Sequence, residues 1–469
     1  MNIKRNFLYN TFYQILIIII PLITTPYVSR VLGSEGVGRF SYSYAIAYCF
    51  VMFAMLGVNN YGNREIAAVN NNLEERSKRF WEIYSLQMAV SLIAIAAYII
   101  YVVVLCEDKT IGWIMLCFVV SAAFDINWFY FGMEEFKITV ARNSIVKLIT
   151  VICIFVFVRT QEDVYIYCFV NVIGMLISQI VLWAVLKKYV NFHKVKAAAV
   201  VKHIKPNLTL FIPVIAISVY KYMDKIMLGM MTVKEEVGFY ESCDKIVQIP
   251  VALITALGIV MLPRITNMIA NQQSDEGLSY TKKSLVFTMF VASPMCFGIM
   301  AVAKEFVPVF YGAGFDKCII VFQFLLPSCI FMAFANVVRT QILIPHQRDR
   351  VYVLSVVLGA VVNLVANILL IPYFQSVGAA IGTLAAEAAV CIVQCIYIRK
   401  DIKIIKYALY GLPFVISSIM MYCIVINLSF NSFTTLEELF VKILIGMGIY
   451  LICSLVIVAI AKHKKLEIS

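Results

Sequence analysis

The sequence predicts an all-α integral membrane protein with about 14 transmembrane helices. Of its 469 residues, 62% are apolar and only 14% are charged, and the mean hydropathy is +0.89. A soluble protein cannot bury that much apolar surface under a polar exterior. In addition, long apolar runs recur from Phe7 to Ala461, which leaves no stretch for a separate soluble domain.

The apolar runs define the individual spans. A helix needs about 20 apolar residues to cross a hydrocarbon layer roughly 30 Å thick, and each run approaches that length. The predicted spans are 11–29, 40–61, 81–105, 111–132, 138–158, 164–186, 207–231, 238–262, 285–303, 317–340, 351–371, 378–398, 407–427 and 437–461.

The distribution of basic residues predicts the orientation. Short cytoplasmic loops carry an excess of Lys and Arg. With the N-terminus inside, the cytoplasmic segments hold about 26 basic residues and the outer loops about seven, so we expect both termini in the cytoplasm. The net charge of +12 follows mainly from this asymmetry and does not indicate nucleic-acid binding. One predicted cytoplasmic connection is especially basic, with Lys187, Lys188, Lys194, Lys196, Lys202 and Lys205.

A short internal repeat predicts two halves. "VLGSEGVGRFSYS" at 31–43 and "MLGMMTVKEEVGFYESC" at 227–243 each end a helix at Leu-Gly and restart at Val-Gly with aromatic and Ser residues. Both copies follow an outward-going span, so the halves run parallel, and parallel halves place a substrate cavity between them. The predicted organisation is an N-terminal lobe at 1–186, a linker at 187–206, a C-terminal lobe at 207–398 and two additional spans at 399–469.

Charges inside one span predict a binding site. In "SVYKYMDKIM" at 218–227, Lys221, Asp224 and Lys225 follow a helical spacing and project to one side. Charges inside the bilayer are costly and usually face a watery cavity or a partner. Arg30 precedes the Leu-Gly of the first repeat copy, as Lys225 precedes that of the second. Lys245, on the span that follows Lys225, is expected at a similar depth in the membrane.

Two interpretations of these cations are open. An anionic ligand could bind Arg30, Lys221, Lys225 and Lys245, because ammonium and guanidinium groups form strong charge-assisted hydrogen bonds with phosphates. Alternatively, the carboxylates of Asp224, Glu241 and Asp244 neutralise them in pairs that brace the helices.

Two further carboxylates, Asp125 and Glu387, lie inside predicted spans. Each is a candidate for coupling to H⁺ or Na⁺, together with Asp224 and Asp244. Hydrogen bonding between helices is the alternative for both.

The absence of several motifs narrows the chemistry. The sequence contains no G-x-x-x-x-G-K-[ST], no H-E-x-x-H and no paired C-x-x-C. We therefore expect no catalytic residues, metal or cofactor. A secondary transporter, a membrane-embedded transferase and a channel are the classes left open, and the repeat favours the transporter.

Four stretches resemble one known family. They are "NTFYQILIIIIPLITTPYVSRVLGSEGVGRFSYS" at 10–43, "FDINWFYFGMEEFK" at 124–137, "QILIPHQRDR" at 341–350 and "NILLIPYFQSVGAAIGTLAAE" at 367–387. The second places Asp125, Trp128, Gly132 and Glu134 at matching positions. Together they resemble the Wzx-like flippases, the polysaccharide-biosynthesis branch of the multidrug/oligosaccharidyl-lipid/polysaccharide exporter superfamily.

This resemblance implies two six-helix lobes in pseudo-twofold relation, as in multidrug exporters of the MATE type, plus two C-terminal helices. It implies a substrate, an oligosaccharide repeat unit on a polyprenyl pyrophosphate, that moves to the outer leaflet of a bacterial inner membrane by alternating access. Glycosyltransferases and a polysaccharide polymerase are the implied partners beside membrane lipid. A cation-coupled multidrug exporter of the same fold is the first alternative, and a membrane polysaccharide polymerase or ligase is the second.

Overall fold

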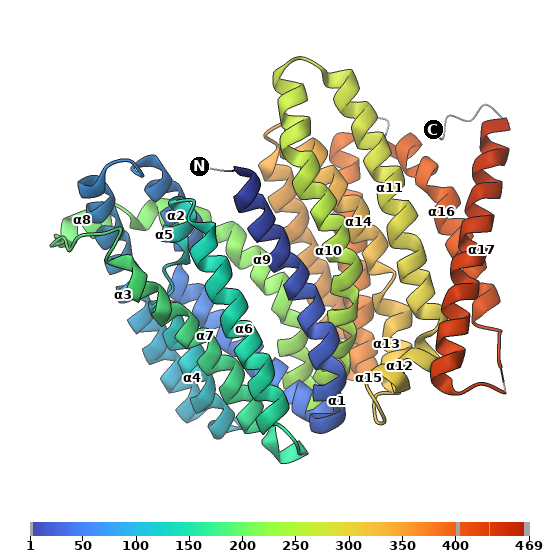
Figure 1. The fold of residues 1–469 in the computed structure, drawn as a ribbon, viewed down its shortest axis with the longest axis horizontal. Helices are drawn as coiled ribbons and strands as arrows, with labels where there is room; N and C mark the ends of the chain where they lie inside the picture. The colour runs from blue at the N-terminus through green and yellow to red at the C-terminus, as the bar shows by residue number, and fades with distance from the viewer. Residues whose placement is uncertain (1–2, 400–403, 431, 464–469) are drawn as a thin grey trace. The chain divides into compact units, whose positions relative to one another are not determined.

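The computed structural model describes residues 3–399, 404–430 and 432–463, and every regular element in these ranges is helical (Figure 1). Ten helical stretches of the described chain are long and apolar enough to cross a membrane. Two of them, Ile19–Ala68 and Asp349–Ile398, each have 50 residues and each contain two predicted spans. Helices suit this environment because they satisfy their own backbone hydrogen bonds where water is absent. The prediction of a multi-pass helical membrane protein is confirmed.

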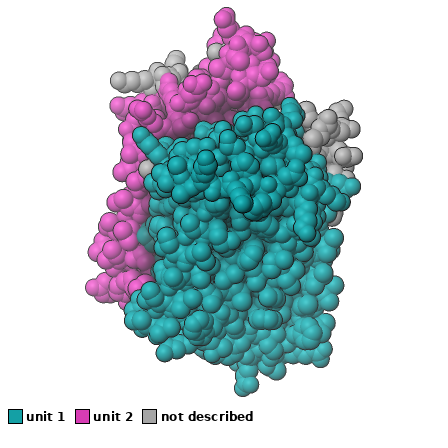
Figure 2. All heavy atoms as spheres, turned by 90° about the vertical axis from the view of Figure 1, so that its left-hand side faces the viewer, with its two compact units in different colours: residues 1–226 teal, residues 227–469 magenta. Residues whose placement is uncertain are grey.

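The chain divides into two compact units, residues 1–226 and 227–469 (Figure 2). The helices that begin in unit 1 are α1 (Ile3–Met55), α2 (Val58–Ala68), α3 (Leu73–Val104), α4 (Lys109–Ala123), α5 (Asn127–Gly132), α6 (Phe136–Phe157), the 3₁₀ turn η1 (Gln161–Asp163), α7 (Val164–Leu186), α8 (Ala197–Val201) and α9 (Ile204–Met231). Those of unit 2 are α10 (Lys234–Ala270), α11 (Ser274–Ala301), α12 (Ala303–Phe310), α13 (Lys317–Leu325), α14 (Ser328–Val338), the π-helical turn η2 (Arg339–Leu343), α15 (Asp349–Ile398), α16 (Ile404–Val425) and α17 (Thr435–His463).

Two pairs of predicted spans form single bent helices instead of separate ones. Spans 11–29 and 40–61 merge into α1, which bends at Gly33 with φ 66°. Spans 351–371 and 378–398 merge into α15, which bends at Gln375 with φ 53°. One residue in the left-handed region is enough to redirect a helix, so the expected loops shrink to bends.

The second predicted span, 40–61, runs past the end of α1 into α2, within the apolar stretch Ile19–Ala68. Helix α1 ends at Met55, because Leu56 and Gly57 both adopt positive φ, 41° and 78°. A Cβ on Gly57 would lie 3.0 Å from the carbonyl oxygen of Asn207, so glycine also permits the first turn of α9 to approach. The short helix α2 then continues in a new direction.

The stretch 124–137, which contributed to the family resemblance, serves packing in the core of unit 1. Trp128 is fully buried, and its Nε1 donates to Gln87 Oε1 at 2.9 Å. Any side chain at Gly62 would clash with the Trp128 ring, and any side chain at Gly132 would meet Ile66. These glycines let α2 and α5 pack closely, which fixes the break between α4 and α5.

Helix α9 groups mainly with unit 1, whereas the sequence assigned it to the lobe that begins at 207. Its Phe211 ring contacts Phe53 at 5.6 Å between centroids, and its Tyr222 ring contacts Tyr48 at 4.2 Å. Aromatic pairs at such distances stabilise beyond the area that they bury. The division into lobes at the 187–206 linker stays a prediction.

Candidate functional site

The charged segment of α9 surrounds one aromatic ring. The ammonium groups of Lys221 and Lys225 lie 5.7 and 5.8 Å from the centroid of the Tyr222 ring. Both distances fall within the range of cation–π attraction. The structure thus brings together two of the four cations that the sequence predicted as ligands.

The members of this segment differ in exposure. Lys221 is exposed, whereas Asp224 and Lys225 are 4% and 7% exposed and engaged with partners. Among the described residues, Lys221 has no carboxylate within ion-pair distance. Because the pairing alternative requires such a carboxylate, Lys221 fits the ligand interpretation better than the bracing one.

Aromatic rings of α1 and α4 extend the site. Tyr222 lies 6.3 Å from Tyr44, which stacks on Phe118 of α4 at 4.8 Å between ring centroids. Tyr44 and Tyr48 are one helical turn apart on α1 and therefore share a face. Cations beside partly buried aromatic rings suit a ligand that carries both phosphate and sugar.

Arg30 lies on the same unit, on the first half of α1. Its side chain is exposed, and Nη1 donates to the carbonyl oxygen of Pro26 at 3.4 Å. It precedes the bend at Gly33 by less than one helical turn. The position is therefore at the end of a helix half, as the repeat predicted.

Lys245 belongs to unit 2 and is paired. Its Nζ lies 3.5 Å from Glu241 Oε1, one turn earlier on α10. The neighbouring Asp244 accepts a hydrogen bond from Gln248 Nε2 at 3.0 Å. Both contacts lie within α10, so they neutralise Lys245 locally without joining two helices.

Asp125 takes part in a buried polar network at the break between α4 and α5. Its Oδ1 accepts from the backbone N of Asn127 at 2.9 Å and from Asn127 Nδ2 at 2.7 Å. Asn127 Oδ1 in turn accepts from Arg142 Nη2 at 2.9 Å. Arg142 also donates to the oxygens of Ser178, Gln179 and Asn143. The Asp125 carboxylate thus holds the start of α5 locally, and Asn127 and Arg142 connect this turn to α6 and α7.

Lys147 of α6 is a cation that the sequence analysis missed. It lies about 16 Å from the start of α6, near the middle of a hydrocarbon layer roughly 30 Å thick. Its side chain is half-buried, and the described part of the chain offers it no hydrogen-bond or ion-pair partner. The opposite face of α6 exposes Ile145, Ile149 and Ile152, which is typical of contact with lipid. Charges at 142 and 147 within the apolar run 138–158 are the signal that would have found it.

Glu387 lies in the second half of α15 and is 7% exposed. On the preceding turn, Thr383 Oγ1 lies 2.8 Å from the Tyr240 hydroxyl of α10. Glu387 and Asp244 both belong to unit 2, on α15 and α10.

Unit 2 also contains an apolar cavity of about 480 Å³ between α11, α16 and α17. Gly298, Met421, Gly446 and Tyr450 contribute to its lining. The one charged residue on its wall, Lys442, already contacts Glu305 at 2.6 Å and Glu438 at 3.0 Å. This cavity accordingly lacks the chemistry for a charged headgroup.

Comparison with known proteins decides the family. Residues 3–269 match the family described as "Polysaccharide biosynthesis protein". The chain belongs to this family. Its relatives include a protein of Escherichia coli (strain K12) named "Putative O-antigen transporter", 23% identical over 86% of this chain and 98% of the relative. A protein of Haloferax volcanii named "Probable low-salt glycan biosynthesis flippase Agl15" is 24% identical over 49% of each chain.

Solved structures establish the fold of this polysaccharide biosynthesis protein. The structure titled "Lipid II flippase MurJ, inward closed conformation" aligns over 97% of this chain and 98% of its own, with a TM-score of 0.71 at 17% identity. An inward-facing multidrug resistance MATE family transporter of the MOP superfamily aligns over 82% of this chain and 95% of its own, with a TM-score of 0.61 at 12% identity. The predicted MATE-like fold is confirmed.

Proposed function

We propose that this protein moves polyprenyl-pyrophosphate-linked oligosaccharide repeat units from the cytoplasmic to the outer leaflet by alternating access. The product would serve the assembly of a cell-surface polysaccharide such as O-antigen, capsule or exopolysaccharide. Family membership and relatives named as an O-antigen transporter and a glycan flippase support this proposal. The observation that carries it is the cluster of Lys221, Lys225 and Tyr222 on α9, within the span that hydropathy predicts at 207–231.

The headgroup fits the cations of unit 1. A pyrophosphate needs donors in a solvated site, and we assign this role to Arg30, Lys221 and Lys225, with Lys147 as an additional cation. Lys245 is a weaker candidate because Glu241 already neutralises it. Tyr44 and Tyr48 offer aromatic edges to the sugars.

The membrane potential assists transport in the proposed direction. In a bacterial inner membrane the cytoplasm is negative, and each negative charge moved outward gains about 2.3 kcal/mol per 100 mV. Two charges on a pyrophosphate therefore gain roughly 4–5 kcal/mol per 100 mV. Coupling to H⁺ or Na⁺ would use a buried carboxylate, for which Glu387 and Asp224 are the most enclosed candidates. The expected topology has both termini in the cytoplasm, where glycosyltransferases supply the substrate.

A multidrug exporter of the same fold is the second candidate, favoured by the likeness to the MATE family transporter. Cationic drugs would require an acidic site, whereas Lys221 and Lys147 lack carboxylate partners among the described residues. The two functions are distinguishable by the cargo that accumulates when the protein is removed.

The test is complementation of a host strain that lacks the gene. Lys221→Ala and Lys225→Ala should each lower surface glycan and raise the amount of lipid-linked precursor on the cytoplasmic side. Loss of one charge-assisted hydrogen bond of about 1.5–3 kcal/mol predicts a reduction of at least about tenfold. Lys221→Arg, which keeps the charge, is the matched control, and the amount of each variant in the membrane must equal that of the wild type.

Full complementation by both alanine variants would contradict the assignment of the site. Drug sensitivity of the deletion strain with normal surface glycan would instead favour the exporter.

A further inference from the structure

The basic connection between α7 and α9, residues 187–203, is fixed to α3 at two points. At the first point, the Tyr189 carbonyl oxygen accepts from Arg76 Nε at 3.1 Å and Nη2 at 2.9 Å. The backbone N of Asn191 donates to Ser77 Oγ at 3.0 Å, and Trp81 Nε1 donates to the Asn191 carbonyl oxygen at 2.9 Å. Buried Val190 adds apolar contact between these bonds.

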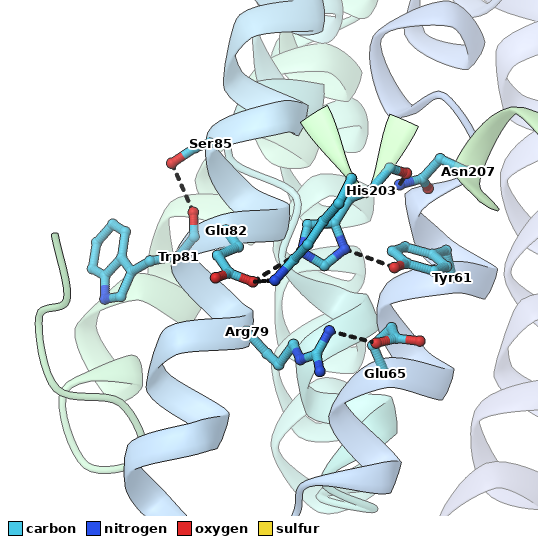
Figure 3. A network of polar contacts seen from close by, with 9 residues as sticks. Tyr61, Glu65, Arg79, Trp81, Glu82, Ser85, His203 and Asn207 are labelled. Atoms are coloured by element: carbon cyan, nitrogen blue, oxygen red, sulfur yellow. Dashed lines mark hydrogen bonds and ion pairs between the residues drawn. The ribbon is translucent and has the colours of Figure 1, made fainter. Parts of the chain in front are cut away.

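The second point is a buried network around His203 (Figure 3). His203 Nε2 lies 3.0 Å from Glu82 Oε2, and its Nδ1 lies 2.6 Å from the Tyr61 hydroxyl. Lys202 Nζ contacts the same Glu82 oxygen at 2.9 Å. Because Glu82 and His203 are almost completely buried, this network pins the end of the connection where α9 begins.

Beside and between the two points the connection turns apolar and basic side chains outward. Phe192 is 76% exposed and Val201 is 61% exposed. Lys187, Lys188, Lys194 and Lys196 are exposed as well, and residues 187–203 contain no Asp or Glu. The exposure of Phe192 is not a consequence of a loose loop, because its backbone neighbour Asn191 is held by two hydrogen bonds.

The position of Phe192 is that of a membrane interface. Its ring packs edge-on against Trp81 at 5.4 Å between centroids, and Trp81 also neighbours Tyr84 and Trp183. Trp and Tyr concentrate where spanning helices leave the hydrocarbon layer. These aromatic residues lie near the start of α3 and the end of α7, two helices that are long and apolar enough to span.

We propose that residues 187–201 dock on anionic phospholipid headgroups of the adjoining leaflet. Phe192 and Val201 enter the interfacial layer, and the four exposed lysines contact lipid phosphates. A basic segment with an aromatic anchor is the pattern that binds anionic membrane surfaces. A segment that only sets the orientation of the protein in the membrane needs lysines, but it does not need an ordered, exposed phenylalanine. The two attachment points on α3 then hold the start of α9 beside the lipid surface.

The test uses the full-length protein in nanodiscs, with the photocrosslinking residue p-benzoylphenylalanine at position 192. Phe433→p-benzoylphenylalanine is the matched control, because Phe433 is also an exposed phenylalanine between two spans but precedes Glu437 and Glu438. We expect lipid adducts at 192 that increase when phosphatidylglycerol replaces part of the phosphatidylcholine, with no such increase at 433.

Lys194→Gln combined with Lys196→Gln sharpens the test, because Lys187 and Lys188 remain to set the topology. The phosphatidylglycerol-dependent adducts at 192 should fall about fivefold for each lysine removed, the factor that a surface lysine contributes on an anionic membrane. Equal adducts in both lipid mixtures would overturn the proposal. Crosslinking of residue 192 to a second protein, and not to lipid, in native membranes would also overturn the proposal.

Discussion

Three lysines of unit 2 and two lysines of unit 1 differ in their charge partners. In unit 2, Lys245, Lys317 and Lys442 each contact a carboxylate, Glu241, Glu236 and Glu305 respectively. In unit 1, Lys221 lies beside the Tyr222 ring and Lys147 lies within α6, and neither has a carboxylate partner in the described ranges. A paired cation stabilises the fold, whereas one without a counter-charge is suited to an anionic ligand.

The pairs of unit 2 also hold its helix ends. Glu236 accepts from the backbone N of Ser376 at 3.1 Å and from its Oγ at 2.6 Å, directly after the bend of α15 at Gln375. Lys317 donates to Glu236 and also contacts Gln375. The Glu236 carboxylate therefore connects α10, α13 and the start of the second half of α15, and these contacts hold the strained residue Gln375 in place.

The largest effect in this comparison is expected from Lys442→Met. The ammonium is 4% exposed, and its removal leaves Glu305 buried without its counter-charge. Breaking such a pair typically costs about 3–5 kcal/mol of the free energy of unfolding. Thermal unfolding of the purified protein in detergent measures this loss.

The combination of Lys442→Met with Glu305→Leu provides the control for that experiment, because it removes both charges. It should regain most of the lost stability. If the single variant is as stable as the wild type, the pair does not support the fold and the contrast between the units weakens.

Lys147→Ala should have the next largest effect, but on transport. Because nothing described pairs with Lys147, its removal should leave the unfolding temperature unchanged or slightly raised. If the headgroup contacts this ammonium, transport should fall about tenfold or more. Lys147→Arg should retain most of the activity. A loss of stability with normal transport per folded molecule would show that Lys147 has a bracing role.

Lys245→Ala should have the smallest effect. The ion pair with Glu241 spans one helical turn and is partly exposed, so its loss costs roughly 0.3–0.5 kcal/mol. Surface delivery of the glycan should stay within about twofold of wild type. This change is smaller than the effect expected from the loss of one charged hydrogen bond. A drop as large as that of Lys221→Ala would place Lys245 in the binding site and remove the distinction between the units.

The sequence predicted several residues of the candidate site, but not the residues that contact them. The spacing of Lys221 and Lys225 predicted a shared side, and the structure places both around Tyr222. The sequence did not predict the role of the 124–137 motif, in which Trp128 and Gly132 serve packing between helices. Arg142 was missed because its hydrogen-bond partners outside α6 come from α5 and α7, which are distant in the sequence.

Hydropathy is a local property, so the sequence by itself determined the membrane class, the positions of most spans and the family. The sequence alone did not predict the helix bends, because a positive φ at Gly33 or Gln375 depends on what packs against that residue. The sequence alone also did not predict which charged residues form ion pairs. Glu305 and Lys442 are 137 residues apart, and Glu236 and Lys317 are 81 apart, so only the packing of whole helices brings each carboxylate to its cation. Tertiary structure therefore decided which of these lysines lie beside a carboxylate and which do not.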